Sequence, residues 1–415
     1  MEEKKAIFIV LDGLGDRPTP ILGGKTPLQA ATKPTIDSLA TQGSSGIIDV
    51  VAAGVPAGSD VAHLHLFGYD YESDYPGRGT LEALGVDLPV GPGDVAFRGN
   101  FAHIDAQQTV LDRRAGRDIP DADEFIDALN GLAIDGYPDV EIRFKHSTEQ
   151  RVGVVLHGPG LSSAVSDVDP GKNGYQVKTC IPLDGTAEAE RTAGIVNVVI
   201  PEIQRILGPH PANTIRENEG RPFVNAILFY GPGTGKDVVK FQDRYRISAA
   251  CVTGNGLIRG LCSYLGIENL PCEGATGTFT TDLVAKMDVA LDALRDHDFV
   301  FIHVKATDSC GHDRQSEKKR DFIERFDGAL AHLLETYDLS KNFLALTGDH
   351  STPATAGEHT GDPVPFVLAG PTVIRDGLTC FDETGSARGY FSRFNGKCLM
   401  PIILNKLDKL EKFGA

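Results

Sequence analysis

The feature that most restricts the fold of this chain is a set of short apolar runs, each about as long as a buried β-strand. The runs are AIFIVL at 6–11, FVFIHV at 299–304, FLALTG at 343–348 and FVLAG at 366–370. Uninterrupted apolar runs of this length are typical of parallel strands that helices cover on both faces. Helical patterns lie between some of the runs, so the sequence predicts an α/β sandwich with a mainly parallel central sheet.

Two helical segments agree with this architecture. The segment LQAATKPTIDSLATQG follows Thr26-Pro27 and predicts a capped helix that is broken near Pro34. The segment at 317–337, EKKRDFIERFDGALAHLLETY, has the apolar spacing of an amphipathic helix and precedes the run at 343–348. The two ends of the chain therefore belong to one architecture.

The middle of the chain has a different pattern. RGNFAHID at 98–105 and RVGVVLHG at 151–158 predict strands, and EFIDALNGLA at 124–133 predicts a helix between them. This order is typical of an α+β domain. We therefore predict an inserted smaller α+β domain at 96–214.

The remaining segments, 1–95 and 215–415, are predicted to form a discontinuous core. The segment at 208–222 is rich in Pro, Gly and Asn, and we expect it to be the return linker. NAILFYGPG at 225–233 is then expected to re-enter the core.

Composition narrows the choice of partners. The formal net charge of -17 would repel a phosphate backbone, which argues against nucleic acid and anionic membrane surfaces. The first apolar run meets Asp12 after six residues, and no apolar stretch approaches the roughly 20 residues of a membrane span. Seven scattered cysteines without a CxxC pair indicate neither a disulfide framework nor a thiolate zinc site. We expect a soluble cytoplasmic protein with a small-molecule partner; its oligomeric state is left open.

Carboxylates follow three of the predicted strands. Asp12 directly follows the run at 6–11, Asp349 directly follows FLALTG, and Asp308 lies four residues after FVFIHV. Ligands of open parallel sheets bind beyond the carboxyl ends of the strands, so these side chains are expected to meet. A single such Asp is often only a turn or cap residue, whereas three of them indicate a common site.

Histidines accompany these carboxylates. Asp308 and His312 form D-x-x-x-H, His350 follows Asp349, and His359 lies in GEHTGDPVP. Imidazole and carboxylate together suit Mn or Zn better than Ca. One His considered alone is more often a surface or capping residue, but the combination predicts a metal cluster. These side chains could fill two sites, which would hold both a nucleophile and a transferring group.

Ser59 is the candidate nucleophile. It follows a Pro/Gly turn and stands where the helical pattern SDVAHLHLFG begins. The simpler interpretation is a helix N-cap. At the same position a phosphoserine would face the positive end of the helix, and a metal could lower the pKa of the hydroxyl group. No G-x-S-x-G elbow surrounds Ser59, and GPGTGKD at 231–237 lacks the Ser or Thr of a Walker A loop.

These motifs, in their order along nearly the whole chain, resemble the alkaline phosphatase superfamily. They are VLDGLGD, GSDVAHLHLFGYD, the D-x-x-x-H pair, GDHS and HTGDPVP. Together with GRGTLEALGVDL, LDRRAGRDIP and GATGTFTTDLVAK, they make the chain similar to the archaeal-type 2,3-bisphosphoglycerate-independent phosphoglycerate mutases. The resemblance implies an alkaline-phosphatase-like fold with an inserted domain.

The resemblance also implies a cofactor. Two divalent metal ions are expected, Mn²⁺ first, with Zn²⁺, Co²⁺ or Mg²⁺ as alternatives, and no bisphosphoglycerate. One ion would be held by Asp12, Ser59, Asp349 and His350, and the other by Asp308, His312 and His359.

The implied reaction is the interconversion of 3-phosphoglycerate and 2-phosphoglycerate in glycolysis or gluconeogenesis, through a phosphoserine at Ser59. Arg113, Arg114 and Arg117 in LDRRAGRD suit the forked recognition of phosphate and carboxylate, although they could form a solvated turn. Asp118 resembles a proton-shuttling carboxylate of the bacterial-type relatives. Phosphate contacts, or ordinary salt bridges, are expected of Lys305 and Arg78.

Two other functions stay open from the sequence. A metal-dependent phosphatase or another phosphomutase of the superfamily would share the metal core and differ in the inserted domain. A non-catalytic metabolite-binding protein would have lost Ser59 or a metal ligand, and none is missing.

Overall fold

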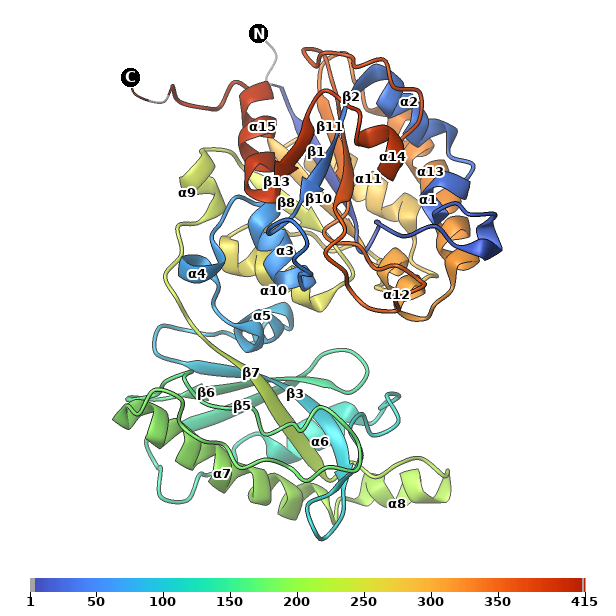
Figure 1. The fold of residues 1–415 in the computed structure, drawn as a ribbon. Coiled ribbons are helices and arrows are strands. Elements are labelled where there is room, and N and C mark those ends of the chain that lie inside the picture. Colours follow the sequence, from blue (N-terminus) through green and yellow to red (C-terminus); the bar gives the residue numbers. More distant parts are fainter. Residues whose placement is uncertain (1–3, 413, 415) are drawn as a thin grey trace. The chain divides into compact units, whose positions relative to one another are not determined.

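The structure is a computed structural model that describes residues 4–412 and 414. The chain forms two compact units (Figure 1). Unit 1 contains the segments up to Tyr75 and from Val239 onward, and unit 2 is the continuous segment Pro76–Val238. The division therefore lies outside the expected boundaries of 96–214 on both sides.

A mixed eight-stranded sheet forms the centre of unit 1. β12 is antiparallel to both of its neighbours, β11 and β2. The other neighbouring strands of this sheet pair in parallel. The predicted mainly parallel sheet is thus confirmed. In spatial order the strands are β13 (Ser392–Asn395), β2 (Gly43–Asp49), β12 (Val364–Ala369), β11 (Phe343–Thr347), β1 (Ala6–Leu11), β10 (Phe299–Val304), β8 (Ala249–Val252) and β9 (Glu268–Asn269).

The expectation of a parallel strand at 366–370 is wrong. This run belongs to β12, which is antiparallel to β11. The connection between β11 and β12, residues 348–363, contains no helix. A parallel neighbour needs a crossover connection, usually a helix, whereas an antiparallel neighbour does not.

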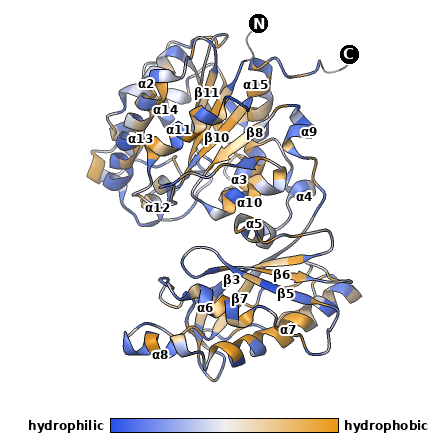
Figure 2. Cartoon of the chain, turned by 180° about the vertical axis from the view of Figure 1, so that it is seen from behind, coloured by the Kyte–Doolittle hydropathy of each residue, from blue (hydrophilic) through white to orange (hydrophobic). Residues whose placement is uncertain are grey.

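Both faces of this sheet are buried. Ile7 and Ile9 of β1 point into a core that contains residues from α2, α11 and α13. Phe8 points to the other face, where its ring lies 6.4 Å from Phe67 beside α3 and 5.6 Å from Phe301 of β10. Figure 2 shows the apolar strands between helices of mixed character. Burial on both faces explains why the strands are uninterrupted apolar runs.

Two of the predicted helices of unit 1 are present. The segment at 317–337 forms α13, and the predicted break near Pro34 separates α1 from α2. Thr26 caps α1 by accepting a hydrogen bond from the backbone N–H of Gln29 at 3.0 Å. The α-helices of unit 1 are α1 (Pro27–Ala30), α2 (Pro34–Gln42), α3 (Ser59–Leu66), α4 (Tyr71–Asp74), α9 (Phe241–Tyr245), α10 (Gly256–Leu265), α11 (Leu283–Ala293), α12 (Ala306–His312), α13 (Ser316–Thr336), α14 (Glu383–Ser386) and α15 (Leu399–Lys406).

Unit 2 is built on an antiparallel five-stranded sheet. β3 pairs with β4, β6 and β7, and β5 pairs with β6. The expected α+β character of this region is present. Its elements are α5 (Arg78–Gly85), β3 (Val95–Ile104), β4 (Val110–Asp112), α6 (Ala122–Leu129), β5 (Glu141–His146), β6 (Arg151–His157), α7 (Ala187–Leu207), α8 (Pro211–Asn218) and β7 (Ala226–Thr234).

The expectation that 225–233 returns to the core is wrong. This segment forms β7, which pairs with β3 from Ala226 opposite Ala102 to Thr234 opposite Val95. At the other boundary, α5 packs on the same sheet, and a Cβ at Gly79 would lie 2.3 Å from the carbonyl oxygen of Ala96. The assignment of 225–233 and the first boundary of unit 2 both depend on packing between segments that are distant in the sequence. Local apolar patterns do not specify such packing.

None of the helices in the described ranges combines the length and apolar character that crossing a membrane requires.

Candidate active site

Three buried aspartates meet beyond the carboxyl ends of neighbouring strands in unit 1. β1 lies between β10 and β11, so Asp12 after β1 is central. Asp308 lies in α12, just after β10, and Asp349 follows β11. Their exposed fractions are 0%, 2% and 0%, so none of these carboxylates has solvent as a partner. The structure brings together the three aspartates singled out in the sequence.

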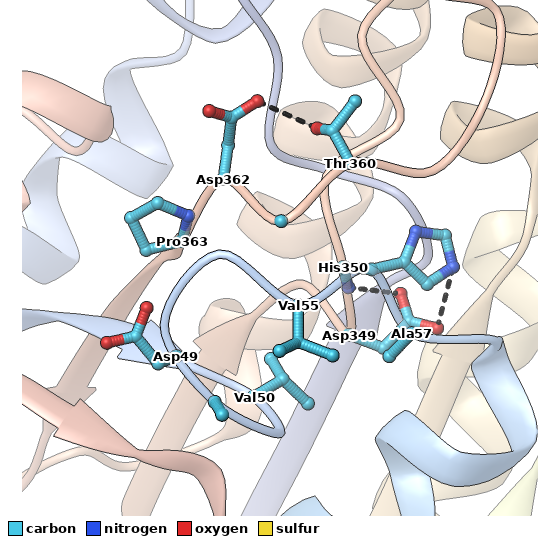
Figure 3. Close-up of a pocket in the computed structure, with 11 residues that line it drawn as sticks. Asp49, Val50, Val55, Ala57, Asp349, His350, Thr360, Asp362 and Pro363 are labelled. Atoms are coloured by element: carbon cyan, nitrogen blue, oxygen red, sulfur yellow. Dashed lines mark hydrogen bonds and ion pairs between the residues drawn. The ribbon is translucent and has the colours of Figure 1, made fainter.

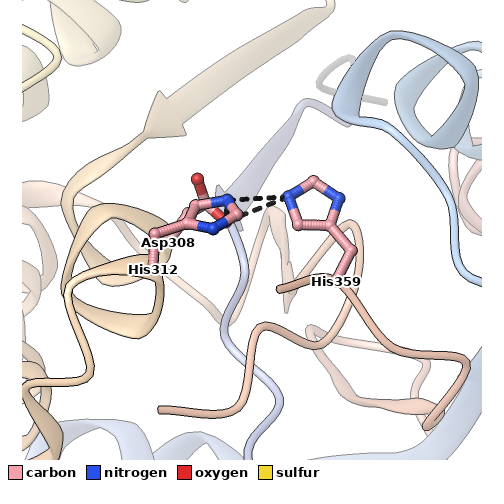
Figure 4. Close-up of side chains that lie close together, drawn as sticks. All are labelled: Asp308, His312 and His359. Atoms are coloured by element: carbon pink, nitrogen blue, oxygen red, sulfur yellow. Dashed lines mark hydrogen bonds and ion pairs between the residues drawn. The ribbon is translucent and has the colours of Figure 1, made fainter. Parts of the chain in front are cut away.

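Asp308, His312 and His359 form the first group of ligand-type side chains (Figure 4). The Nε2 atoms of His312 and His359 lie 3.4 Å and 3.3 Å from Asp308 Oδ1, and 3.2 Å from each other. Each Nδ1 lies at hydrogen-bond distance from a backbone carbonyl, 2.9 Å from Gly357 for His312 and 2.7 Å from Ala57 for His359. A carbonyl only accepts, so Nδ1 carries the proton and the Nε2 lone pair faces the group.

Asp12, Asp308 and His350 form the second group, in which one ligand atom from each side chain lies within 4.8 Å of the others. His350 Nε2 is 3.4 Å from Asp12 Oδ1 and 3.3 Å from Asp349 Oδ2. Asp308 therefore takes part in both groups, whereas the sequence analysis placed it in one. A carboxylate has two oxygens and can serve two cations at once.

Asp349 has one satisfied and one unsatisfied oxygen. Oδ1 accepts hydrogen bonds from the backbone N–H groups of Gly13 at 2.9 Å and His350 at 3.1 Å. Oδ2 is buried and has no hydrogen-bond partner among the described residues. Figure 3 shows Asp349 and His350 next to Ala57 at a small cavity. A buried oxygen without a partner is costly, and a cation there would satisfy it. The donors are oxygen and imidazole nitrogen, so the residues fit divalent transition metals.

Ser59 is the first residue of α3, and Gly58 is the N-cap. The simpler interpretation, that Ser59 caps the helix, is therefore wrong. The Ser59 hydroxyl lies 3.1 Å from His350 Nε2 and 3.4 Å from Asp12 Oδ2. It is only 6% exposed and lies at the positive end of α3. The hydroxyl is thus held against the second group.

Lys305 lies between the two groups. Its Nζ is 3.0 Å from Asp12 Oδ1 and 2.5 Å from Asp308 Oδ2. Burial opposes the charge of Asp12 and Asp308, but the charge of Lys305 holds the pKa of both carboxyls well below the usual range. The hydrogen bond from His303 lowers the pKa of Asp12 further. Burial together with the charge of Asp12 raises the pKa of Asp349. One ammonium group thus balances two carboxylates, whereas no Lys or Arg of the described residues forms an ion pair with the third, Asp349.

Two histidines of the site were not singled out in the sequence. His303 Nε2 lies 2.9 Å from Asp12 Oδ2, and His63 Nδ1 lies 2.7 Å from the carbonyl oxygen of Ser59. Burial lowers the pKa of each imidazole to about 4. The available signal was an imidazole inside an otherwise apolar strand, FVFIHV, next to a candidate ligand. For His63 the signal was its spacing of four residues from Ser59 along α3.

The remaining predicted substrate residues lie in unit 2. Arg113 donates from Nε to both carboxylate oxygens of Asp169, at 2.7 and 2.8 Å. Arg78 Nε lies 3.6 Å from Glu82. The exposed guanidinium of Arg114 makes no hydrogen bond or ion pair within the described parts of the chain. Burial and the neighbouring charges of Arg117 and Arg113 lower the pKa of Arg114, which indicates a locally positive surface.

Unit 2 contains a cavity of about 440 Å³ beside the C-terminal end of this arginine segment. Arg117 and Asp118 line it together with His146 and Glu149. Its size suits a small organic ligand. The cavity thus contains two residues that the sequence analysis proposed for substrate and proton handling.

Comparison with known proteins supports one family. The family described as 2,3-bisphosphoglycerate-independent phosphoglycerate mutase matches residues 40–213. The chain is similar to the 2,3-bisphosphoglycerate-independent phosphoglycerate mutase of Ignicoccus hospitalis, with 45% identity over the full length of both chains.

Two solved structures are also similar. The PH0037 protein from Pyrococcus horikoshii has a TM-score of 0.85 and 35% identity, with both chains fully covered. The cofactor-independent phosphoglycerate mutase from Thermoplasma acidophilum has a TM-score of 0.71 and 35% identity, covering 97% of this chain and 100% of that one.

Proposed function

The chain belongs to the 2,3-bisphosphoglycerate-independent phosphoglycerate mutases, and we propose that it interconverts 3-phosphoglycerate and 2-phosphoglycerate through a phosphoserine at Ser59 beside two divalent metal ions. It is therefore an isomerase that needs no bisphosphoglycerate. The observation that carries the proposed mechanism is the position of the Ser59 hydroxyl, 3.1 Å from His350 and 3.4 Å from Asp12 at the start of α3.

The two ions would be held by the two groups of side chains. Asp308, His312 and His359 present one carboxylate and two imidazole lone pairs. Asp12, Asp308 and His350 present two carboxylates and an imidazole, and Asp349 and Ser59 lie 3.3 Å and 3.1 Å from His350 Nε2 as the further proposed ligands. Mn²⁺ is the ion proposed first, and Zn²⁺, Co²⁺ or Mg²⁺ are alternatives, because carboxylate and imidazole donors accept all of these. When bound, the ions would lower the pKa of the Ser59 hydroxyl and neutralise charge on the transferring phosphoryl group.

The steps assigned to the chain itself begin with Ser59. Its Oγ forms a bond to phosphorus as the ester bond to glycerate breaks, and the hydroxyl proton of Ser59 leaves with the glycerate oxygen. The glycerate then presents its other hydroxyl, which attacks the phosphoserine and restores Ser59. Asp118 is the proposed carrier of the glycerate hydroxyl proton. Lys305 is a proposed contact of the phosphoryl group, because its ammonium already lies between Asp12 and Asp308.

Recognition of the glycerate is assigned to unit 2. Arg114 and Arg117 are the proposed contacts of the carboxylate, because exposed guanidinium groups in a locally positive surface favour an anion. Arg113 is proposed to support them from its ion pair with Asp169. For Arg78 a phosphate contact stays a proposal, since its side chain is close to Glu82.

The test is a coupled assay that follows 2-phosphoglycerate and free phosphate from 3-phosphoglycerate, on metal-free protein with and without added Mn²⁺. We expect metal-dependent 2-phosphoglycerate without added bisphosphoglycerate. Release of phosphate alone would instead establish a phosphatase on the same metal core.

Ser59→Ala addresses the intermediate directly. We expect this variant to keep metal binding and the fold while phosphoryl transfer is abolished. In the wild type, acid quenching after incubation with labelled 3-phosphoglycerate should leave labelled phosphate on the peptide that contains Ser59. Ser73→Ala changes an exposed serine of the same unit and is the control. Turnover in the Ser59→Ala variant would exclude a phosphoserine route.

A further inference from the structure

His303 is a fully buried imidazole that touches the candidate metal site without belonging to either ligand group. It is the last residue but one of β10, where it pairs in register with Val10, two residues before Asp12. Its Nε2 lies 2.9 Å from Asp12 Oδ2, and its Nδ1 lies 3.1 Å from the hydroxyl of Thr253. Both ring nitrogens therefore have a defined polar partner.

The partners determine which nitrogen of His303 carries the proton. Thr253 Oγ1 accepts a hydrogen bond from the backbone N–H of Asn255 at 3.1 Å, so its own hydrogen is free to be donated to Nδ1. On the other side Nε2 faces a carboxylate, which only accepts. The ring is thus neutral, with the proton on Nε2, and it donates to Asp12.

This tautomer is opposite to that of the histidines in the ligand groups. His312 and His359 donate from Nδ1 to carbonyls and keep the Nε2 lone pair. His350 does the same through Thr352, which donates its own hydrogen to Asp308 at 2.7 Å and so accepts from His350 Nδ1 at 3.0 Å. His303 has no Nε2 lone pair for a metal. Its contact with the site is a donated hydrogen bond.

The position of His303 is fixed from several directions. The buried ammonium of Lys286 donates to its backbone carbonyl at 2.9 Å. The ring of His63 packs against it edge to face, with centroids 5.2 Å apart. The imidazole therefore has little freedom to follow Asp12 if that carboxylate moves.

We propose that His303 is a positioning residue: its Nε2–H holds Asp12 Oδ2, so that the carboxylate is oriented toward the metal site, and Thr253 selects the tautomer that makes this possible. The inference rests on the proposed function insofar as Asp12 is a metal ligand. Partners of ligands typically change metal affinity by about 10- to 100-fold when they are lost.

Four variants of the full-length protein test this role through Mn²⁺ affinity, measured by titration calorimetry. His303→Leu removes the donor at similar volume, and we expect Mn²⁺ to bind about 10- to 100-fold more weakly. His303→Gln keeps an N–H that reaches Asp12, so its affinity should return most of the way to that of the wild type. Thr253→Val should weaken binding by a smaller factor, while Thr253→Ser, which keeps the hydroxyl, should bind like the wild type.

A spectroscopic readout separates positioning from packing. In protein labelled with ¹⁵N-histidine and loaded with Mg²⁺, the His303 ring should show the neutral form protonated at Nε2. Thr253→Val should shift this signature while the thermal unfolding temperature stays within a few degrees. A His303 protonated at Nδ1 in the wild type would overturn the proposal, and so would equal Mn²⁺ affinity in His303→Leu and wild type.

Asp12→Asn distinguishes this failure from failure of the proposed function. If Asp12→Asn binds Mn²⁺ as the wild type does, Asp12 is not a ligand and the metal site itself is wrong. If Asp12→Asn loses Mn²⁺ while His303→Leu does not, only the role of His303 is overturned.

Discussion

The molecule has two clusters of charged side chains that differ in how they are built. The strand-end cluster of unit 1 consists of Asp12, Lys305, Asp308 and Asp349, which come from three strands far apart in the sequence and are mostly buried. The arginine turn of unit 2, residues 112–118, is local: Asp112 accepts hydrogen bonds from the backbone of Arg114 and Gly116.

This difference determines what each cluster tolerates. In the strand-end cluster water cannot replace a lost partner, so each removal leaves another charge unpaired. At the exposed side chains of Arg114 and Arg117 in the arginine turn, water solvates whatever a substitution exposes, so a loss there concerns recognition of an anion. Substitutions in the first cluster should thus have larger effects than those in the second.

The largest effect is expected from Asp308→Asn. Asp308 takes part in both ligand groups, so its loss should weaken metal binding at both and lower mutase activity by roughly 1,000-fold. Bound metal is measured by elemental analysis and turnover by the coupled assay. Asp313→Asn changes an exposed carboxylate at the end of the same helix and should leave both unchanged. Full metal content in the Asp308→Asn variant would contradict the proposal that Asp308 is a ligand in both groups.

The next-largest effect, a loss of folding stability, is expected when the buried side chain of Lys319 is replaced. Lys319 is fully buried, and its Nζ donates to the carbonyls of Gly13 and Thr352 and to the Asp16 carboxylate, at 2.7, 3.1 and 2.8 Å. Lys319→Met leaves these acceptors unsatisfied and should lower the free energy of unfolding by about 3–5 kcal/mol. Denaturant titration measures this. The exposed neighbour is the control, since Lys318→Met should cost less than about 1 kcal/mol.

A smaller effect, on substrate binding alone, is expected in the arginine turn. Arg114→Ala should raise the KM for 3-phosphoglycerate roughly tenfold and leave metal content unchanged, because one hydrogen bond to a charged group contributes about 1.5–3 kcal/mol. Arg113→Ala should raise KM less, since that guanidinium is engaged by Asp169. An unchanged KM in Arg114→Ala would exclude this residue from the binding site.

The smallest effect is a pH dependence of stability. Burial raises the pKa of Glu383 to about 7, although Thr26 donates a hydrogen bond to it at 2.8 Å. A carboxyl with a raised folded-state pKa stabilises the fold below its unfolded pKa of about 4.5, and this stability is lost as pH rises through about 7. Glu383→Gln should remove a slope of about 1 kcal/mol per pH unit between pH 5 and 7, measured by thermal unfolding. Identical pH profiles would contradict this assignment.

Much of the fold was accessible from local pattern. The apolar runs at 6–11, 299–304 and 343–348 predicted parallel strands because burial on both faces leaves no polar alternation. The same reasoning misjudged β12 and β7. Both are apolar, and an apolar run does not state its direction or its partner.

The sequence by itself determined which side chains stand at the strand ends, because chain order places Asp12, Asp308 and Asp349 within four residues after buried strands. The tertiary structure decided that Asp308 is shared, that Ser59 does not cap its helix, and that His303 donates to Asp12. Those outcomes depend on hydrogen bonds between segments up to 291 residues apart. The sequence gives the donors and acceptors of each side chain, but only the folded structure shows which partner group lies opposite them.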